Sequence, residues 1–314
     1  MQYKDGNLSM ARKTASLILA VVLALSVISC GRNGEAVAPA PSEIERDGAV
    51  VSYLGPRGTY TQEACERFFG EETELVPFET VPDAVTALVE GDSNYAVIPV
   101  ENTIGGAVTD YVDTLISNSS VSVVGEVELP INQNLLVLPG TVLSDIRKVY
   151  SHKQGIAQGK EWLSVNLPEA EVIEVSSTAE GARRVSEEQD RSCAAIASAG
   201  CADVYGLEIL VPAIQNNDKN VTRFYVLKSG EAGIYGSART AFIAEGTADD
   251  MAALAAKLKK QGITVIAIHD RPLKTQLGQY SFLVECSYIA GDTFARVTGN
   301  SSMSIRNLGS FDVK

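Results

Sequence analysis

The sequence predicts an α/β fold in two parts: open, mainly parallel sheets with helices on both faces, followed by a small α+β module. Two observations predict it. From Ala49 to Ala197 short apolar strand patterns alternate with helix patterns, and after Lys228 the order of the elements changes. Alternating strands and helices form sheets that are covered on both faces. The 314 residues, 45% of them hydrophobic, leave room for about two domains.

The elements of the first part follow one another as strand and helix. Apolar runs predict strands over Ala49–Leu54, Tyr95–Val100, Val121–Leu138 (as one or two strands), Glu171–Val175 and Cys193–Ala197. Helical spacing predicts helices over Thr61–Phe69, Val81–Glu90, Ala107–Ile116, Gln154–Val165 and Ala179–Glu188. Open α/β sheets bind ligands beyond the carboxyl ends of their strands. We therefore expect the functional groups in the loops that follow strands.

The second part follows a linker at Ser229–Ser237 and has a different order. Its patterns predict strands over Thr240–Ala244, Ile263–Ile268, Tyr280–Cys286 and Ser304–Asp312, and helices over Asp249–Lys260 and about Asp292–Gly299. This order is similar to that of small ferredoxin-like α+β domains.

The N-terminus has the pattern of a secretory signal. Arg12 and Lys13 precede an apolar run from Ala15 to Ile28, which is short for a membrane span. The run closes on Cys30 in a string that resembles a lipobox, whose Cys is acylated; a plain signal peptide or an anchor helix is the alternative. We expect a signal peptide over residues 1–30, a flexible Ala- and Pro-rich tether over 31–48, and an exported periplasmic or cell-surface lipoprotein that contacts the membrane only through its lipid.

Composition excludes some functions. The net charge of −13 and the isoelectric point near 4.7 argue against a nucleic-acid partner, which requires a basic face. An anionic ligand must then be attracted by local donors. The cysteines beyond Cys30 show no CxxC spacing and the chain has only two histidines, so we expect no metal site. Buried free thiols are expected, although export leaves a disulfide open.

Two loops after predicted strands collect hydrogen-bond donors. The first holds Thr59 and Thr61 at a helix start, where free N–H groups make a ready anion site. In the second, Asn102 and Thr103 supply side-chain donors and Gly105 lets the backbone approach a ligand closely. Glu101 precedes them and is the one carboxylate in these loops with a route to a pocket, as a general acid or as a structural hydrogen-bonding group.

Two later loops repeat this pattern. His152 stands at a strand-to-helix turn, and Ser177 and Thr178 stand at another helix start. Each such loop, taken alone, is more often a helix cap than a binding site.

The string Thr222-Arg223-Phe224 is a further candidate ligand site. It places a hydroxyl donor beside a permanent cation and a flat ring. That combination suits a small, anionic, ring-shaped ligand. The alternative is an ordinary strand in which Thr222 and Arg223 face water and Phe224 faces the core.

The segment from Tyr205 to Leu227, with Asn216 six positions before Thr222, resembles the signature of prephenate dehydratases. The string Gly55-Pro-Arg-Gly-Thr59 matches that family's opening motif, and the resemblance extends from about residue 51 to 227. It implies a catalytic domain over residues 49–228 with two lobes, similar in architecture to a periplasmic binding protein. The family has Pro where Lys153 stands, which weakens the transfer of a role to His152, and an aliphatic residue where Tyr225 stands.

The resemblance implies an enzyme of phenylalanine biosynthesis, a lyase that converts prephenate to phenylpyruvate, water and CO2. Aromatisation drives this reaction, so no cofactor or metal is expected. By analogy Thr222 assists departure of the ring hydroxyl, with Glu101 as a second catalytic candidate. Arg223 either holds a carboxylate or pairs with an acid that braces its strand. The substrate-binding residues implied are Thr59, Asn102, Thr103, Gly105, Ser177, Thr178, Arg223 and Phe224.

Residues 238–314 resemble the regulatory ACT module of these enzymes. Their phenylalanine-binding Glu-Ser-Arg-Pro appears here as His269-Asp270-Arg271-Pro272, and the start of the first helix carries Asp249 and Met251. Because Asp249 and Asp250 would repel an amino-acid carboxylate at a helix start, we expect phenylalanine inhibition to be weak or lost. An amino-acid effector and a homodimer or homotetramer are the partners implied.

Three other functions stay open. Arogenate dehydratase differs only in the substrate's amino group. A solute-binding lipoprotein of a transporter would also be a tethered two-lobed α/β body. A catalytically inactive sensor would fit the export signal and the altered regulatory motif.

Overall fold

The computed structural model describes residues 43–314. The predicted signal peptide, Cys30 and most of the predicted tether lie outside the described residues. Within the described range no helix combines the length and the apolar character that crossing a membrane requires.

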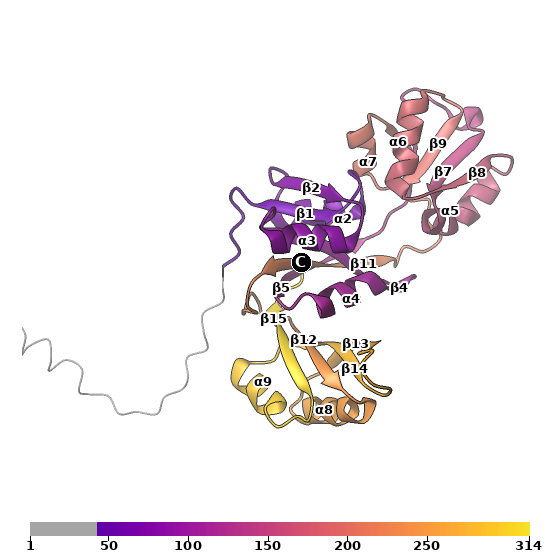
Figure 1. The fold of residues 1–314 in the computed structure, drawn as a ribbon. Helices are drawn as coiled ribbons and strands as arrows, with labels where there is room; N and C mark the ends of the chain where they lie inside the picture. The colour runs from indigo at the N-terminus through magenta and orange to yellow at the C-terminus, as the bar shows by residue number, and fades with distance from the viewer. Residues whose placement is uncertain (1–42) are drawn as a thin grey trace, which may run out of the picture. The chain divides into compact units, whose positions relative to one another are not determined.

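The sheet of the first lobe is mixed (Figure 1). Its strands lie in the order β2-β1-β3-β11-β5, with the short β4 on β3. β1 runs parallel to β2 and β3, whereas β11 runs antiparallel to β3 and β5. The bounds are β1 Val50–Leu54, β2 Glu74–Phe78, β3 Tyr95–Asn102, β4 Gly106–Ala107, β5 Val121–Pro130 and β11 Val221–Ser229. The prediction of mainly parallel sheets is therefore wrong, because β5 leaves this lobe and β11 returns beside it in the opposite direction.

Helices cover both faces of this sheet. α2 (Tyr60–Phe69) buries Ala64 and Phe68 against one face. α3 (Val81–Glu90) and α4 (Thr109–Ser117) bury apolar side chains against the other face.

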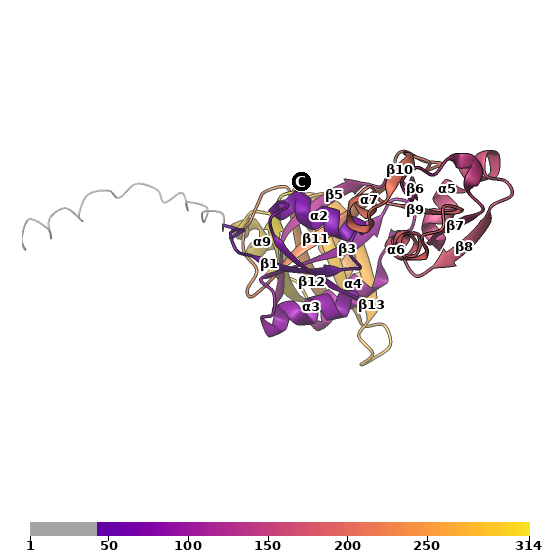
Figure 2. The same ribbon diagram turned by 90° about the horizontal axis from the view of Figure 1, so that it is seen from above.

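The second lobe is a sheet of order β10-β6-β9-β7-β8, which Figure 2 shows with its helices from above. β7 runs parallel to β8 and β9, and β6 and β10 run antiparallel to their neighbours. α6 and α7 pack on one face and α5 on the other. The bounds are β6 Asn134–Val137, β7 Lys148–His152, α5 Lys153–Asn166, β8 Glu171–Val175, α6 Thr178–Glu188, β9 Cys193–Ala197, α7 Gly200–Tyr205 and β10 Glu208–Val211, with a 3-10 turn at Leu143–Asp145.

Two chain crossings join the lobes. The chain leaves the first lobe after Pro130 and re-enters it at Val221, and the crossings are tied where Ile131 N donates to Asn220 O at 2.8 Å. The predicted run Val121–Leu138 thus divides into β5 of one lobe and β6 of the other.

The C-terminal module, residues 239–311, is an antiparallel sheet of order β13-β14-β12-β15 with two helices. α8 and α9 pack on one face of the sheet, and the other face packs on α4 and β11 of the first lobe. The bounds are β12 Arg239–Gly246, α8 Ala248–Lys260, β13 Val265–Pro272, β14 Tyr280–Ser287, α9 Gly291–Thr298 and β15 Ser304–Phe311. The order of elements is that of a ferredoxin-like α+β fold.

The cysteines of the described range, Cys65, Cys193, Cys201 and Cys286, are buried free thiols.

Candidate functional site

A pocket of about 240 Å³ lies where the two lobes meet, between the chain crossings and the ends of β1, β3 and β7. Its wall combines hydroxyl, amide and apolar groups from both lobes. The lining residues are Leu54, Gly55, Thr59, Tyr60, Thr61, Asn102, Ile131, Gln133, His152, Gln154, Gly155, Gln158, Ser176, Ser177, Thr178 and Thr222.

Three helix N-termini converge on this pocket. The N-cap residues of α2, α5 and α6 are Thr59, His152 and Ser177, and all three line the wall. A helix N-terminus presents unpaired N–H groups and a partial positive charge. Because none of the lining residues is Lys, Arg, Asp or Glu, the helix ends supply the positive potential. The pocket therefore favours an anion that is held by dipoles and hydrogen bonds.

Two of these caps keep a donor for a ligand. Ser177 Oγ accepts from Glu180 N at 3.0 Å, which leaves its own hydroxyl hydrogen for the pocket. His152 Nδ1 accepts from Gln154 N at 3.3 Å, so in the neutral ring the proton sits on Nε2. Thr59 instead donates its hydroxyl to Leu54 O at 3.3 Å.

Thr222 and Asn102 form the centre of the site. Asn102 Nδ2 donates to Thr222 Oγ1 at 2.9 Å and to Asn220 Oδ1 at 2.8 Å. Asn102 Oδ1 accepts from Gly105 N at 2.9 Å and from Gln154 Nε2 at 3.2 Å, which fixes the orientation of the amide. Since Thr222 Oγ1 is an acceptor here, and no described group takes its hydrogen, Thr222 can donate into the pocket.

Gln133 places an unpartnered acceptor in the same wall. Its side chain is buried, and Nε2 donates to Gln158 Oε1 at 2.9 Å. Gln133 Oε1 has no hydrogen-bond partner among the described residues. A buried carbonyl oxygen without a partner is costly, so it is satisfied by water or by a donor on a ligand.

Five of the predicted site residues, namely Thr59, Asn102, Ser177, Thr178 and Thr222, line the pocket. Glu101 and Arg223 do not, because side chains alternate along paired strands and these two point to the face opposite Asn102 and Thr222. Arg223 Nη1 donates to Glu101 at 2.7 Å and Nε to Glu126 at 2.6 Å. Of the two roles considered for Arg223, this geometry supports the brace, and it leaves Glu101 without a place as a general acid at the pocket.

The remaining residues that were predicted to bind the substrate also lie outside the pocket wall. Phe224 is buried in the core beneath the first sheet, not open to a ligand ring. Thr103 Oγ1 donates to Val221 O at 2.9 Å and accepts from Val221 N at 3.1 Å, so it secures the return of the chain. Gly105 lies outside the wall as well, and its N–H donates to Asn102 Oδ1.

Sequence reasoning missed Gln133, Gln154, Gln158 and Tyr60. Gln154 and Gln158 stand four residues apart at the start of a predicted helix, a spacing that places both on one face and could have indicated them. Tyr60 OH donates to Asn132 O in the crossing between the lobes at 2.6 Å, and burial raises the pKa of Tyr60 well above the ordinary value, so it stays protonated.

The predicted regulatory residues do not gather at one place in the C-terminal module. Met251 is in the core of the module, and Asp249 is exposed in the first turn of α8. His269 faces the first lobe, with its ring 5.9 Å from that of Tyr111. Asp270, Arg271 and Pro272 end β13, and Arg271 Nε pairs with Asp113 of α4 at 2.6 Å.

Fold and site together define a class: a two-lobed α/β protein with an anion pocket at the crossings between its lobes and a ferredoxin-like module behind it. A family model described as prephenate dehydratase matches residues 51–232, more than half of the chain. The chain belongs to the prephenate dehydratase family.

Relatives and solved structures agree with this assignment. The chain is 33% identical over 249 residues to the prephenate dehydratase of Lactococcus lactis subsp. cremoris, covering 75% of this chain and 85% of that protein. It is 38% identical over 238 residues to a bifunctional chorismate mutase/prephenate dehydratase of Neisseria gonorrhoeae, covering 75% of this chain and 66% of that protein. The chain therefore spans just under two thirds of the length of that bifunctional relative.

Among solved structures, prephenate dehydratase from Arthrobacter aurescens in complex with L-Phe superimposes with a TM-score of 0.75 at 27% identity. The superposition covers 84% of this chain and 89% of that chain.

Proposed function

We propose that this protein catalyses the decarboxylating dehydration of prephenate to phenylpyruvate, CO2 and water. The observation that supports it is the Thr222 hydroxyl: Asn102 orients it, its hydrogen is free, and it faces a pocket ringed by three helix N-termini.

The proposed reaction requires a hydrogen-bond donor at the leaving oxygen and a site for one carboxylate. The bond between the ring and its carboxylate breaks, and that electron pair passes through the diene to expel hydroxide from the opposite ring carbon. The dianion thus yields phenylpyruvate, CO2 and hydroxide, and hydroxide takes one proton to become water. Thr222 hydrogen-bonds the departing oxygen, and helix ends hold the pyruvyl carboxylate. A pocket without a cation near the second carboxylate leaves that group poorly stabilised, which favours its loss.

The test is turnover of prephenate by purified protein, followed as phenylpyruvate absorbance in alkali. We expect Thr222→Ala to lower kcat about 10²–10³-fold and Thr222→Ser to keep most of the activity, since the hydroxyl is what matters. Near-wild-type turnover by Thr222→Ala would reject the role. Binding of prephenate without turnover by the wild type would instead favour a receptor or a sensor.

Arogenate is the second candidate substrate, and Gln133 favours it. The free Oε1 of Gln133 is an acceptor in the pocket wall. Arogenate offers an ammonium donor as well as the ring hydroxyl, whereas prephenate offers the ring hydroxyl alone. The ratio of kcat/KM for the two substrates, measured with one enzyme preparation, decides between them.

We further propose that the C-terminal module is a regulatory ACT module with a weak response to phenylalanine. The relative from Arthrobacter aurescens is described in complex with L-Phe. Here Asp249 adds an exposed carboxylate at the start of α8, and His269 is directed at the first lobe. Strong inhibition of purified protein by micromolar phenylalanine would contradict this proposal.

We also propose that the protein is an exported lipoprotein acylated at Cys30 and that it assembles as a homodimer or homotetramer. The sequence of residues 1–30 supports export and acylation of Cys30, and family resemblance supports a homodimer or homotetramer. Membrane fractionation of the wild type beside Cys30→Ala tests the anchor, and light scattering of the purified protein tests the assembly. Release of the wild type and the variant alike into the soluble fraction would reject lipidation.

A further inference from the structure

The strand pair that carries the central residues is interrupted next to the site. β11 pairs with β3 so that Thr222 lies opposite Asn102 and Arg223 opposite Glu101, and the register shifts between Arg223 and Phe224. Such a shift leaves a residue unpaired and weakens the ladder locally. The ladder between β11 and β5 runs unshifted through these residues, and on the pocket face Asn102 adds a side-chain bond to Thr222.

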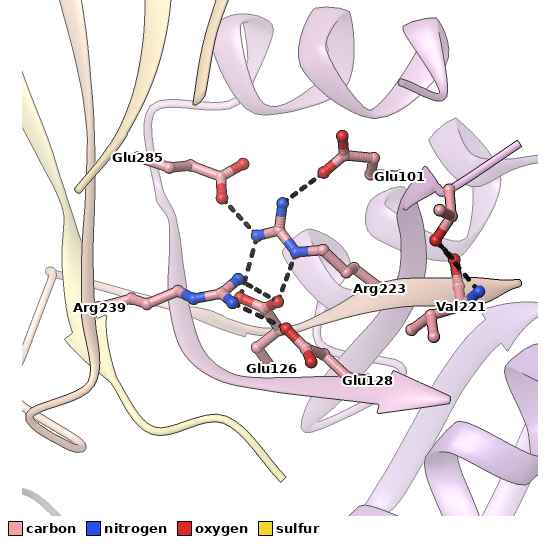
Figure 3. A network of polar contacts seen from close by, with 8 residues as sticks. Glu101, Glu126, Glu128, Val221, Arg223, Arg239 and Glu285 are labelled. Carbon is pink, nitrogen blue, oxygen red and sulfur yellow. Dashed lines mark hydrogen bonds and ion pairs between the residues drawn. The ribbon is translucent and has the colours of Figure 1, made fainter. Parts of the chain in front are cut away.

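Arg223 holds the opposite face. Its guanidinium makes four hydrogen bonds, two to Glu126 of β5, one to Glu101 of β3 and one to Glu285 of β14 (Figure 3). The Arg223 side chain is 11% exposed, and those of Glu126 and Glu285 are fully buried. A charge in that environment has no water to replace a missing partner. The position of Arg223 therefore depends on all three carboxylates.

Glu285 differs from the other two partners because it belongs to the C-terminal module. Its Oε1 has no partner among the described residues, so Glu285 is held by Arg223 through its other oxygen. The hydroxyls of Tyr111 and Tyr225, whose rings are 6.0 Å apart, are also buried without a partner. Among the described residues, the one hydrogen bond of the Glu285 side chain is the bond to Arg223.

We propose that Arg223 and Glu285 are positioning residues for the reaction: through Glu285, the C-terminal module sets the geometry of the Thr222–Asn102 pair. Arg223 directly follows Thr222 on β11, so we expect the contacts of its guanidinium to restrain the part of the strand that carries the Thr222 hydroxyl. Misplacement of a reacting group by about 1 Å costs on the order of 10²-fold in rate. This inference rests on the proposed function, and it makes the module part of the working enzyme even without an effector.

The experiment compares Glu285→Gln, which keeps the size of the side chain and removes its charge, with Glu285→Asp, which keeps the charge. Glu128→Gln is the control: Glu128 lies opposite Arg223 in the β11–β5 register and pairs with Arg239 at 2.7 Å, but it forms no ion pair with Arg223. We measure kcat and KM for prephenate, the thermal midpoint, and hydrogen exchange of the backbone amides of residues 221–224 in the absence of substrate.

We expect Glu285→Gln to lower kcat about tenfold with KM changed less than about twofold, and to speed exchange at residues 221–224. Glu285→Asp should show a smaller fall in kcat and a smaller rise in exchange than Glu285→Gln. Glu128→Gln should change neither kcat nor exchange at residues 221–224. Unchanged kcat and exchange in Glu285→Gln would overturn the inference. So would equal losses in Glu285→Gln and Glu128→Gln that simply follow the thermal midpoint.

The exchange measurement separates this inference from the proposed function. If the wild type turns over neither prephenate nor arogenate, the proposed function fails. Faster exchange at residues 221–224 in Glu285→Gln alone still supports the positioning contact, and unchanged exchange rejects it.

Discussion

The two faces of the β3–β11 strand pair differ in how they use polar groups. The pocket face carries Thr222 and Asn102 in a wall without charged side chains. On the opposite face Arg223 and Glu101 join one ion-pair network with Glu126 and Glu128 of β5 and with Arg239 and Glu285 of the C-terminal module. Thr222 and Arg223 are neighbours on β11, but they differ in role. Thr222 faces a pocket whose wall offers dipoles and hydrogen bonds, whereas Arg223 braces the strands through its charge. In the proposed reaction, full charges at the pocket would stabilise the departing carboxylate and oppose its loss, whereas a brace requires full charges.

Burial shapes the charged face. It raises the pKa of Glu126 above its ordinary value, against the lowering effect of the hydrogen bond from Arg223. Burial alone would lower the pKa of Arg223. The hydrogen bond to Glu126 and the charge of Glu285 outweigh burial and raise this pKa above its ordinary value, so Arg223 stays charged. The brace therefore depends on the cation.

The largest expected effect comes from exchanging one residue on each face. Arg223→Met leaves buried Glu285 without its cation and leaves buried Glu126 with Arg239 alone, so it should lower the free energy of unfolding by roughly 3–5 kcal/mol. Thr222→Val keeps its volume, should change stability by no more than about 1 kcal/mol, and should remove most turnover. Urea denaturation and steady-state kinetics on both variants check this. An Arg223→Met protein of normal stability that had lost only substrate binding would break the comparison.

The sequence predicts where helices and strands lie better than it predicts which face of a strand each side chain occupies. Strong apolar periodicity located most helices and strands, and the motif around Thr222 located the centre of the site. Which of Thr222, Arg223 and Phe224 faces the ligand depends on strand register and on the shift next to Arg223, which no local pattern records. Glu101 was expected in a loop because β3 was predicted to end earlier; on a strand, its direction is opposite to that of Asn102.

The pocket residue Gln133 was missed for a related reason. It lies between β5 and β6, at the crossing between the lobes, inside the stretch Val121–Leu138 that the sequence predicts as one or two strands. A crossing between lobes depends on how the two halves of the chain pack, so apolar periodicity cannot locate it. Arg239 and Glu285 come from the module and meet Glu126 and Arg223 only in three dimensions.

Gln133→Met tests the wall of the pocket, which has no charged side chains. It removes the free acceptor and also the donor to Gln158 Oε1. We expect kcat/KM to fall about tenfold, because an unsatisfied buried polar group costs about 1–3 kcal/mol. The control is Gln215→Met, since Gln215 accepts from Gln133 N but does not line the pocket. Equal effects of the two variants on kcat/KM would show that Gln133 acts through the fold and not through the ligand.

A smaller effect is expected from the contacts between the lobes. Tyr60 OH donates to Asn132 O at 2.6 Å beside the pocket, and Tyr205 OH donates to Arg57 O at 2.9 Å away from it. Removing either hydroxyl should cost about 1 kcal/mol of stability. Only Tyr60→Phe should also raise KM, by a few-fold, since it loosens the pocket wall. Steady-state kinetics and thermal melting of both variants check this, and a raised KM in Tyr205→Phe alone would contradict it.

The smallest effect concerns a carboxylate that braces a helix and touches neither face of the strand pair. Bonds from Ser302 and Thr247 lower the pKa of Asp250 to about 2. Because the folded pKa is below the unfolded value of 3.8, the ionised Asp250 contributes stability fully above that value, and the contribution is lost as pH falls through about 2. Thermal midpoints of wild type and Asp250→Asn should therefore differ at pH 6 and converge as the pH falls toward 2. Asp249→Asn, its exposed neighbour, should match the wild type throughout. A difference between wild type and Asp250→Asn that stayed constant with pH would show that the cap depends on hydrogen-bond geometry and not on charge, unlike the buried carboxylates around Arg223.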